Sequence, residues 1–153
     1  MSENIFRADL LAFGSELVSA CSKCDLNPLV YGSVAVMFHT KDESVTAQDI
    51  DFLIPKSRFP DVINFIRSDP RLRFEETTYN SLRVFKGQLK ASFDSLEDYL
   101  MGMEYQSIEA TLAGHKFFFV DRQTLREVYK RGADRIPMKR DAYVNNFKKL
   151  GDI

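Results

Sequence analysis

Two short groups of residues in the sequence have the types and spacing needed to bind a phosphate and a metal ion. In the first group, Gly32 and Ser33 follow the apolar residues 29–31 and precede the apolar residues 34–38. Glycine lets the backbone approach a phosphate closely, and the serine adds a hydroxyl and an amide. At the start of a helix, free N–H groups and the helix dipole favour anions. The pattern therefore predicts a strand, a phosphate-binding turn and a helix.

The second group is Asp49-Ile50-Asp51-Phe52, in which acidic and apolar residues alternate. This alternation predicts a strand over residues 49–54, ended by Pro55, with both aspartates on one face. Mg²⁺ prefers a few carboxylate oxygens completed by substrate phosphates and water. Two such ions can activate an attacking hydroxyl and stabilise a pyrophosphate leaving group. Each group alone has an ordinary structural explanation, but together they indicate a nucleoside triphosphate site.

The rest of the chain must position these residues, and its pattern predicts one α+β domain over residues 1–153 with a mixed sheet. We expect a core over about residues 28–120 and C-terminal helices over about residues 121–150, divided near Ile136-Pro137. The other expected elements are helices over 5–18 and 60–66, a helix capped by Ser95, and strands over 72–78, 82–93, 108–112 and 116–120.

In these residues the sequence resembles the nucleotidyltransferase superfamily related to DNA polymerase beta, particularly its small bacterial members. The resemblance rests on Tyr31-Gly32-Ser33, on the small residue Ala35 and on Asp49-Ile50-Asp51-Phe52, and it continues in residues 114–127 and 139–150. It implies a nucleotidyltransferase-like mixed sheet flanked by helices. It also implies that Gly32 and Ser33 bind the nucleotide and that Asp49 and Asp51 bind Mg²⁺.

The resemblance also implies a third carboxylate on a neighbouring strand, and the candidate region is residues 90–94. Asp94 is the favoured residue, as a metal ligand or as the general base. In the alternative register Ser92 holds this position, and the protein would then bind nucleotide without efficient transfer.

Composition and charge narrow the classes of partner. The 153 residues carry 21 Lys and Arg against 22 Asp and Glu, a formal charge of −1, which argues against broad binding of duplex DNA. The basic residues concentrate in residues 122–149, a polarity suited to an anionic ligand.

We expect no membrane span, and the N-terminus lacks the basic region of a secretory signal, so a cytoplasmic location is expected. Cys21 and Cys24 are expected to be reduced thiols, with a redox or zinc role as a weaker alternative.

The function expected from the resemblance is Mg²⁺-dependent transfer of a nucleoside monophosphate, from ATP or another nucleoside triphosphate, to a hydroxyl acceptor with release of pyrophosphate. The acceptor could be a small molecule, a protein side chain or RNA. The alternative is a catalytically inactive nucleotide-binding or protein-interaction module of the same fold, comparable to an antitoxin that acts on a partner protein.

Overall fold

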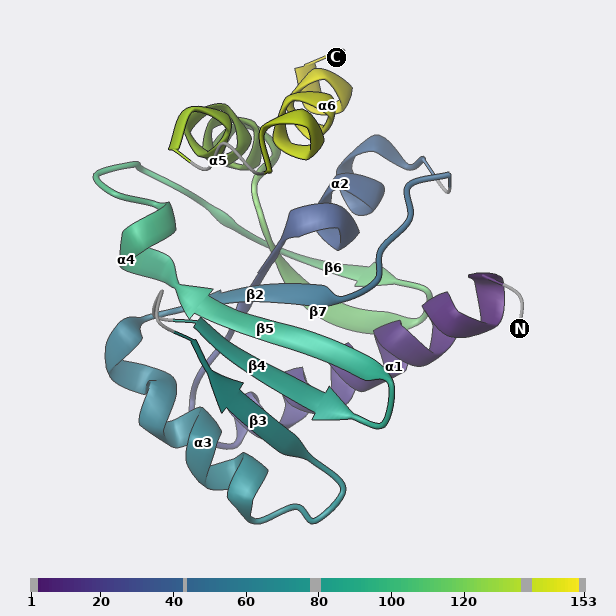
Figure 1. The fold of residues 1–153 in the computed structure, drawn as a ribbon, viewed down its shortest axis with the longest axis vertical. Helices are drawn as coiled ribbons and strands as arrows, with labels where there is room; N and C mark the ends of the chain where they lie inside the picture. Colours follow the sequence, from purple (N-terminus) through teal and green to yellow (C-terminus); the bar gives the residue numbers. More distant parts are fainter. Residues whose placement is uncertain (1–2, 43, 78–80, 136–138, 152–153) are drawn as a thin grey trace.

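A single mixed sheet forms the framework of the molecule in the computed structural model, which describes residues 3–42, 44–77, 81–135 and 139–151. Its strands are β1 (Leu29–Tyr31), β2 (Ile50–Ile54), β3 (Arg73–Glu76), β4 (Ser81–Lys86), β5 (Leu89–Ser95), β6 (Ser107–Leu112) and β7 (His115–Val120). They lie in the order β3-β4-β5-β2-β1-β7-β6. Figure 1 shows β3, β4 and β5 side by side in this sheet. β2 runs antiparallel to β1 and parallel to β5, β1 runs parallel to β7, and the outer pairs are antiparallel.

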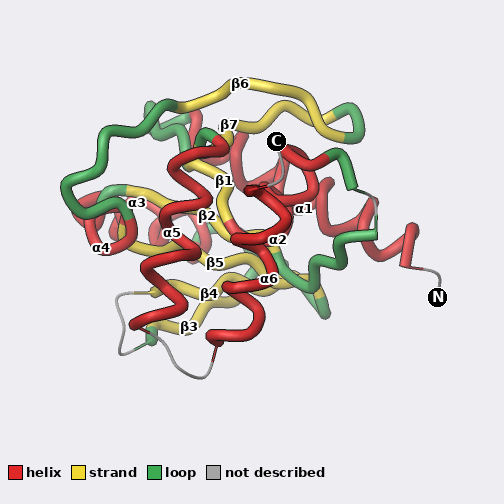
Figure 2. Tube along the Cα trace, turned by 90° about the horizontal axis from the view of Figure 1, so that it is seen from above, coloured by secondary structure: helices red, strands yellow, loops and turns green. Residues whose placement is uncertain are grey.

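Helices cover both faces of this sheet. They are α1 (Glu3–Ser22), α2 (Gly32–Thr40), α3 (Phe59–Arg67), α4 (Leu96–Tyr99), α5 (Arg122–Arg135) and α6 (Arg140–Gly151), with a short 3₁₀ turn η1 (Lys56–Arg58). α1 and α3 pack on one face, whereas α2, α5 and α6 lie together on the other. Figure 2 shows these last three helices over the central strands of the sheet.

Alternation along β2 decides which side chains enter each layer. Ile50 points toward α1, because a Cβ added at Gly14 of α1 would lie 2.6 Å from its Cδ1. Asp51 has the opposite parity and therefore points toward the layer of α2, α5 and α6. Phe52 and Phe93, on adjacent strands, are fully buried and stack with their ring centroids 5.1 Å apart. The apolar core thus holds the strands that carry the acidic residues.

The structure confirms the α+β class, the mixed sheet flanked by helices, and the C-terminal helices. One predicted element is wrong. Residues 82–93 were expected as one strand, but the chain turns at Gly87, which has a φ of +60°, and so divides this region between β4 and β5. Glycine adopts that backbone region readily, which allows the tight turn. The expected break at Ile136-Pro137 lies outside the described residues. No helix in the described ranges is long and apolar enough to cross a membrane.

Candidate nucleotide and metal site

The predicted phosphate-binding turn forms where β1 ends and α2 begins. Gly32 is the first residue of α2 and has a φ of +73°, a conformation that other residues adopt only with strain. Tyr31, at the N-cap, makes no capping hydrogen bond through its side chain within the described chain. The first N–H groups of a helix have no partner within the helix itself. The turn can therefore offer backbone donors to an anion.

Gly32 lies directly against the carboxylate of Asp51. A Cβ on residue 32 would collide with Oδ2 of Asp51 and would lie 3.1 Å from its Cγ. The strand register explains this proximity, because Tyr31 of β1 pairs with Asp51 of β2. The turn and the acidic strand are thus adjacent in space, as the sequence pattern required.

Asp51 is the most perturbed carboxylate of this region. Burial, together with repulsion from Asp49, raises the pKa of Asp51 to about 7. A hydrogen bond from Ser92 and the positive charge of Lys139 act in the opposite direction. Two carboxylates that repel one another favour a bound cation or a shared proton. The electrostatics of the pair therefore suit a divalent ion.

Asp49 lies one residue before β2 and is more accessible to solvent. Its Oδ2 forms an ion pair of 3.3 Å with Nζ of Lys90, and the two side chains are about one third exposed, at 31% and 37%. Lys90 belongs to β5, where the register places it beside residue 49, next to the Ile50–Ala91 pair. The protein thus supplies one ammonium group beside the predicted metal carboxylates.

On β5, Ser92 pairs with Asp51, whereas Asp94 pairs with Leu53. Ser92 and Asp94 share one face of the strand, the face of Asp51. Ser92 Oγ lies 2.7 Å from Oδ1 of Asp51 and 3.0 Å from Oδ2 of Asp94. Asp94 is only 6% exposed. It therefore contacts Asp51 through the serine.

Tyr31 completes this polar group. Its hydroxyl donates a short hydrogen bond to Oδ2 of Asp94, and both side chains are buried. Burial and the negative charge of Asp94 raise the pKa of Tyr31 well above its ordinary value. Tyr31 therefore stays protonated and remains a donor to Asp94.

Tyrosine side chains from α4, α5 and α6 lie within electrostatic range of the carboxylates. The Tyr31 ring lies 5.1 Å from the Tyr99 ring of α4, and Tyr129 of α5 packs 5.3 Å from Tyr143 of α6. Burial raises the pKa of Tyr143, and the charge of Asp51 adds to this effect. The C-terminal helices thus bring tyrosines into the electrostatic range of the site.

The residues present fit a divalent ion held partly by its substrate. Among the described residues, no three His, Cys, Asp or Glu side chains gather closely enough to hold a metal ion by themselves. Mg²⁺ is commonly bound by one or two carboxylates, with phosphate oxygens and water completing its shell. Asp49 and Asp51 provide two carboxylates, and the Gly32 turn lies against the second.

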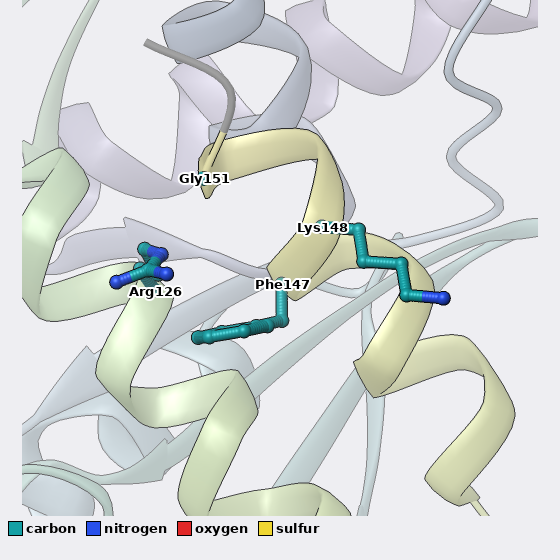
Figure 3. A pocket seen from close by; sticks show the side chains of 4 residues that line it. All are labelled: Arg126, Phe147, Lys148 and Gly151. Carbon is teal, nitrogen blue, oxygen red and sulfur yellow. The ribbon is translucent and has the colours of Figure 1, made fainter.

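A separate hollow of about 320 Å³ lies between the first half of α5 and the C-terminal end of α6 (Figure 3). Its lining is Arg126, Phe147, Lys148 and Gly151, and the Arg126 guanidinium lies 4.3 Å from the centre of the Phe147 ring. None of the predicted site residues lines it.

The Cys21 and Cys24 thiols are free, the first buried and the second exposed, and burial raises the pKa of Cys21 to about 12. That pKa argues against a reactive thiolate at Cys21.

The structure brings Gly32, Asp49 and Asp51 together and places Asp94 behind Ser92. The roles of Lys90 and of the Tyr31 hydroxyl were not predicted from the sequence. One strand carries Lys90, Ser92 and Asp94 at every second position. This spacing could have indicated that all three side chains lie on the face of the aspartates. The Tyr31 contact spans 63 positions and has no local signal.

Comparison with known proteins gives a result at the level of fold. No protein-family model matches the chain, and no curated protein matches it. Among solved structures, ANT(2'')-Ia in complex with adenylyl-2''-tobramycin matches with a TM-score of 0.69 at 14% identity, over 94% of this chain and 87% of that one. An antigenic nucleotidyltransferase-like protein from Paracoccidioides brasiliensis matches with a TM-score of 0.63 at 11% identity, over 92% and 74% of the two chains.

A third match is a protein from Thermotoga maritima provisionally assigned as a nucleotidyltransferase. Its TM-score is 0.62 at 16% identity, and the match covers 92% of this chain and 95% of that one. At such identities the likeness establishes the fold rather than the activity. The chain therefore has the nucleotidyltransferase fold, as its sequence resemblance predicted.

Proposed function

We propose that the protein is a Mg²⁺-dependent nucleotidyltransferase that moves a nucleoside monophosphate from a nucleoside triphosphate, ATP first among them, to a hydroxyl acceptor. The observation that carries the proposal is the contact between Gly32 and Asp51. It places a turn suited to phosphate directly beside a carboxylate pair suited to a cation.

Each residue has a proposed role. Gly32 and Ser33 bind phosphate oxygens, Asp49 and Asp51 hold Mg²⁺, and Asp94 completes the site as its third carboxylate. Mg²⁺ bound there would neutralise phosphate charge and stabilise the departing pyrophosphate. In the reaction, the acceptor oxygen bonds to the α-phosphorus while the bond from that phosphorus to the pyrophosphate oxygen breaks. The acceptor proton passes to a carboxylate of the site.

The acceptor class is the open part of the proposal. ANT(2'')-Ia, which shares the fold, was solved with adenylyl-2''-tobramycin, an adenylylated aminoglycoside. Aminoglycosides are therefore the first small-molecule acceptors to test, followed by RNA and protein hydroxyls. We propose a cytoplasmic setting, where nucleoside triphosphates are available.

A second candidate function is a nucleotide-binding module that does not catalyse transfer and acts through a partner protein. One observation favours it: the position on β5 that pairs with Asp51 holds Ser92 instead of a carboxylate. A serine hydroxyl is a far weaker base than a carboxylate, so removal of the acceptor proton would be slow.

The test measures Mg²⁺-dependent binding of the four nucleoside triphosphates and release of pyrophosphate, with aminoglycosides, RNA or candidate proteins as acceptors. Wild type is compared with Asp49→Asn/Asp51→Asn. Asp9→Asn/Glu75→Gln serves as the control. Like the site variant, it removes two negative charges, but from exposed side chains of α1 and β3. We expect binding and release in wild type and in the control, and loss of both in the site variant.

Binding without release for every acceptor would favour the second function. If wild type does not bind any nucleoside triphosphate in the presence of Mg²⁺, both functions are wrong.

A further inference from the structure

The hydroxyl of Ser92 lies between two buried or half-buried carboxylates. Its Oγ is 2.7 Å from Oδ1 of Asp51 and 3.0 Å from Oδ2 of Asp94. A serine hydroxyl carries one proton and can donate to only one acceptor at a time. The two aspartates therefore compete for a single donor.

The remaining contacts of the two aspartates decide this competition. Oδ2 of Asp94 already accepts a short hydrogen bond from the Tyr31 hydroxyl, whereas Asp51 accepts its side-chain hydrogen bond, within the described part of the chain, from Ser92. The shorter Ser92 distance is also the one to Asp51. Tyr31 thus supplies Asp94 with a donor and leaves the serine proton to Asp51.

Donation from Ser92 also fixes the orientation of the Asp51 carboxylate. With Oδ1 held by Ser92, the opposite oxygen, Oδ2, is the atom that lies against Gly32. This is the oxygen that faces the proposed phosphate-binding turn. A carboxylate that rotated freely would present this oxygen only part of the time.

We infer that Ser92 is a positioning residue, which holds Asp51 with Oδ2 directed at the turn, and that Asp94 acts through Ser92 instead of binding the cation directly. Tyr31 belongs to the same unit, because its donation to Asp94 keeps the Ser92 proton on Asp51. This inference rests on the proposed function, since it concerns how the Mg²⁺–nucleotide site is held. Hydrogen-bonded partners that orient metal ligands typically change metal affinity by about 10- to 100-fold.

The test is equilibrium binding of ATP as a function of Mg²⁺ concentration, measured by calorimetry on the full chain. Ser92→Ala should weaken the Mg²⁺-dependent binding by about tenfold, while Ser92→Thr, which retains the hydroxyl, should restore most of it. Asp94→Asn alone should weaken ATP binding only a few-fold. In the Ser92→Ala background it should weaken binding no further, because the effects of substitutions within one hydrogen-bond network are not additive. Ser107→Ala, an exposed serine on β6, is the control.

Tyr31→Phe provides a second, independent variant that keeps the shape of the side chain. Without the Tyr31 donor, Asp94 should attract the Ser92 proton, so Mg²⁺-dependent binding of ATP should weaken by about two- to fivefold. A directly ligating Asp94 predicts the opposite, because release of its oxygen would leave binding unchanged or tighter. Thermal unfolding of each variant establishes that the protein tested is folded, and Tyr31→Phe carries the test if Ser92→Ala does not fold.

The outcomes separate this inference from the proposed function. If Asp49→Asn/Asp51→Asn abolishes binding but Ser92→Ala and Tyr31→Phe match wild type, the inference is wrong and the proposed function stands. If Asp94→Asn abolishes binding as fully as Asp51→Asn, Asp94 is a direct ligand and the inference is again wrong. Absence of Mg²⁺-dependent ATP binding in wild type overturns both.

Discussion

The α-carbon of Gly32 and the carboxylate of Asp51 are so close that a methyl group on residue 32 would displace the carboxylate. The contact joins the end of β1 to the start of β2 through the Tyr31–Asp51 pair of the register. Position 32 is therefore restricted twice, by its φ of +73° and by the space that Asp51 takes. The two restrictions can be separated by experiment.

Gly32→Ala should lower both stability and nucleotide binding. The left-handed conformation costs about 1–2 kcal/mol for a residue with a Cβ, and the collision moves the Asp51 carboxylate as well. We expect Mg²⁺-dependent ATP binding to fall by more than about tenfold, by calorimetry, because ligand position controls affinity.

Gly114→Ala is the matched control for this variant. Gly114 has a φ of +83°, but a Cβ there would meet nothing within 4 Å. It should lower the melting temperature and leave ATP binding unchanged. Equal loss of ATP binding in the two variants would show that backbone strain, and not the contact with Asp51, is responsible.

The local parts of this site were predictable from the sequence, whereas the strand register was not. Gly32-Ser33 and the alternating Asp49 and Asp51 act over a few residues, so their types and order indicated strand, turn and helix directly. The choice between Ser92 and Asp94 depends on how β5 aligns with β2, which lies 35 or more residues away in the sequence. Pairing across the sheet sets that alignment, and no local pattern encodes it.

The turn at Gly87 shows the same limit in the fold. The alternation is imperfect around Gly87, because the apolar positions change from even (Leu82, Val84) to odd (Leu89, Ala91, Phe93), yet the segment was predicted as a single strand. Only the pairing of β4 with β5, in which Lys86 meets Leu89, makes the glycine a hairpin turn. The hydrophobic pattern thus marked an interruption near Gly87, but it did not show whether the strand bulges or the chain reverses there.

The contact between α5 and α6 gives a prediction on stability. A Cβ on Gly132 of α5 would collide with the Tyr143 ring of α6 and would lie 3.5 Å from its Cζ. Gly132→Ala should therefore lower the free energy of unfolding by about 1–3 kcal/mol, despite the better helix propensity of alanine.

Urea unfolding measures this change, and Gly132→Ala/Tyr143→Leu should recover part of the loss because the smaller side chain makes room. An alanine variant as stable as wild type would mean that the two helices can separate without cost.

The raised pKa of Asp51 predicts a dependence of stability on pH in metal-free protein. An aspartate with a pKa of about 7 in the folded state holds its proton more tightly there than in the unfolded state. Its contribution to stability is therefore present at low pH and is lost as the pH rises toward 7. Asp51→Asn removes this loss, so between pH 5 and pH 8 the variant should gain about 2–3 kcal/mol of stability relative to wild type.

Urea unfolding at the two pH values, with a chelator present, checks the prediction for Asp51. Asp9→Asn, at an exposed position of α1, should show no such gain. A constant difference between Asp51→Asn and wild type at both pH values would contradict a raised pKa for this group.

Lys90 gives a prediction on metal affinity, because its ammonium group occupies a place beside Asp49 that a divalent ion would also favour. The Lys90–Asp49 ion pair, at 3.3 Å, is about one third exposed, so it is a modest competitor. Lys90→Met keeps the unbranched side chain as far as Cε and removes the charged Nζ. We expect Mg²⁺ alone, without nucleotide, to bind about two- to fivefold more tightly to this variant by calorimetry.

Lys116→Met, which removes the exposed ion pair with Glu109 on the β6–β7 hairpin, should bind Mg²⁺ as wild type does. Weaker Mg²⁺ binding in Lys90→Met would mean that the ammonium group supports the site instead of competing for it, and Lys90 would then be placed among the groups that orient Asp49.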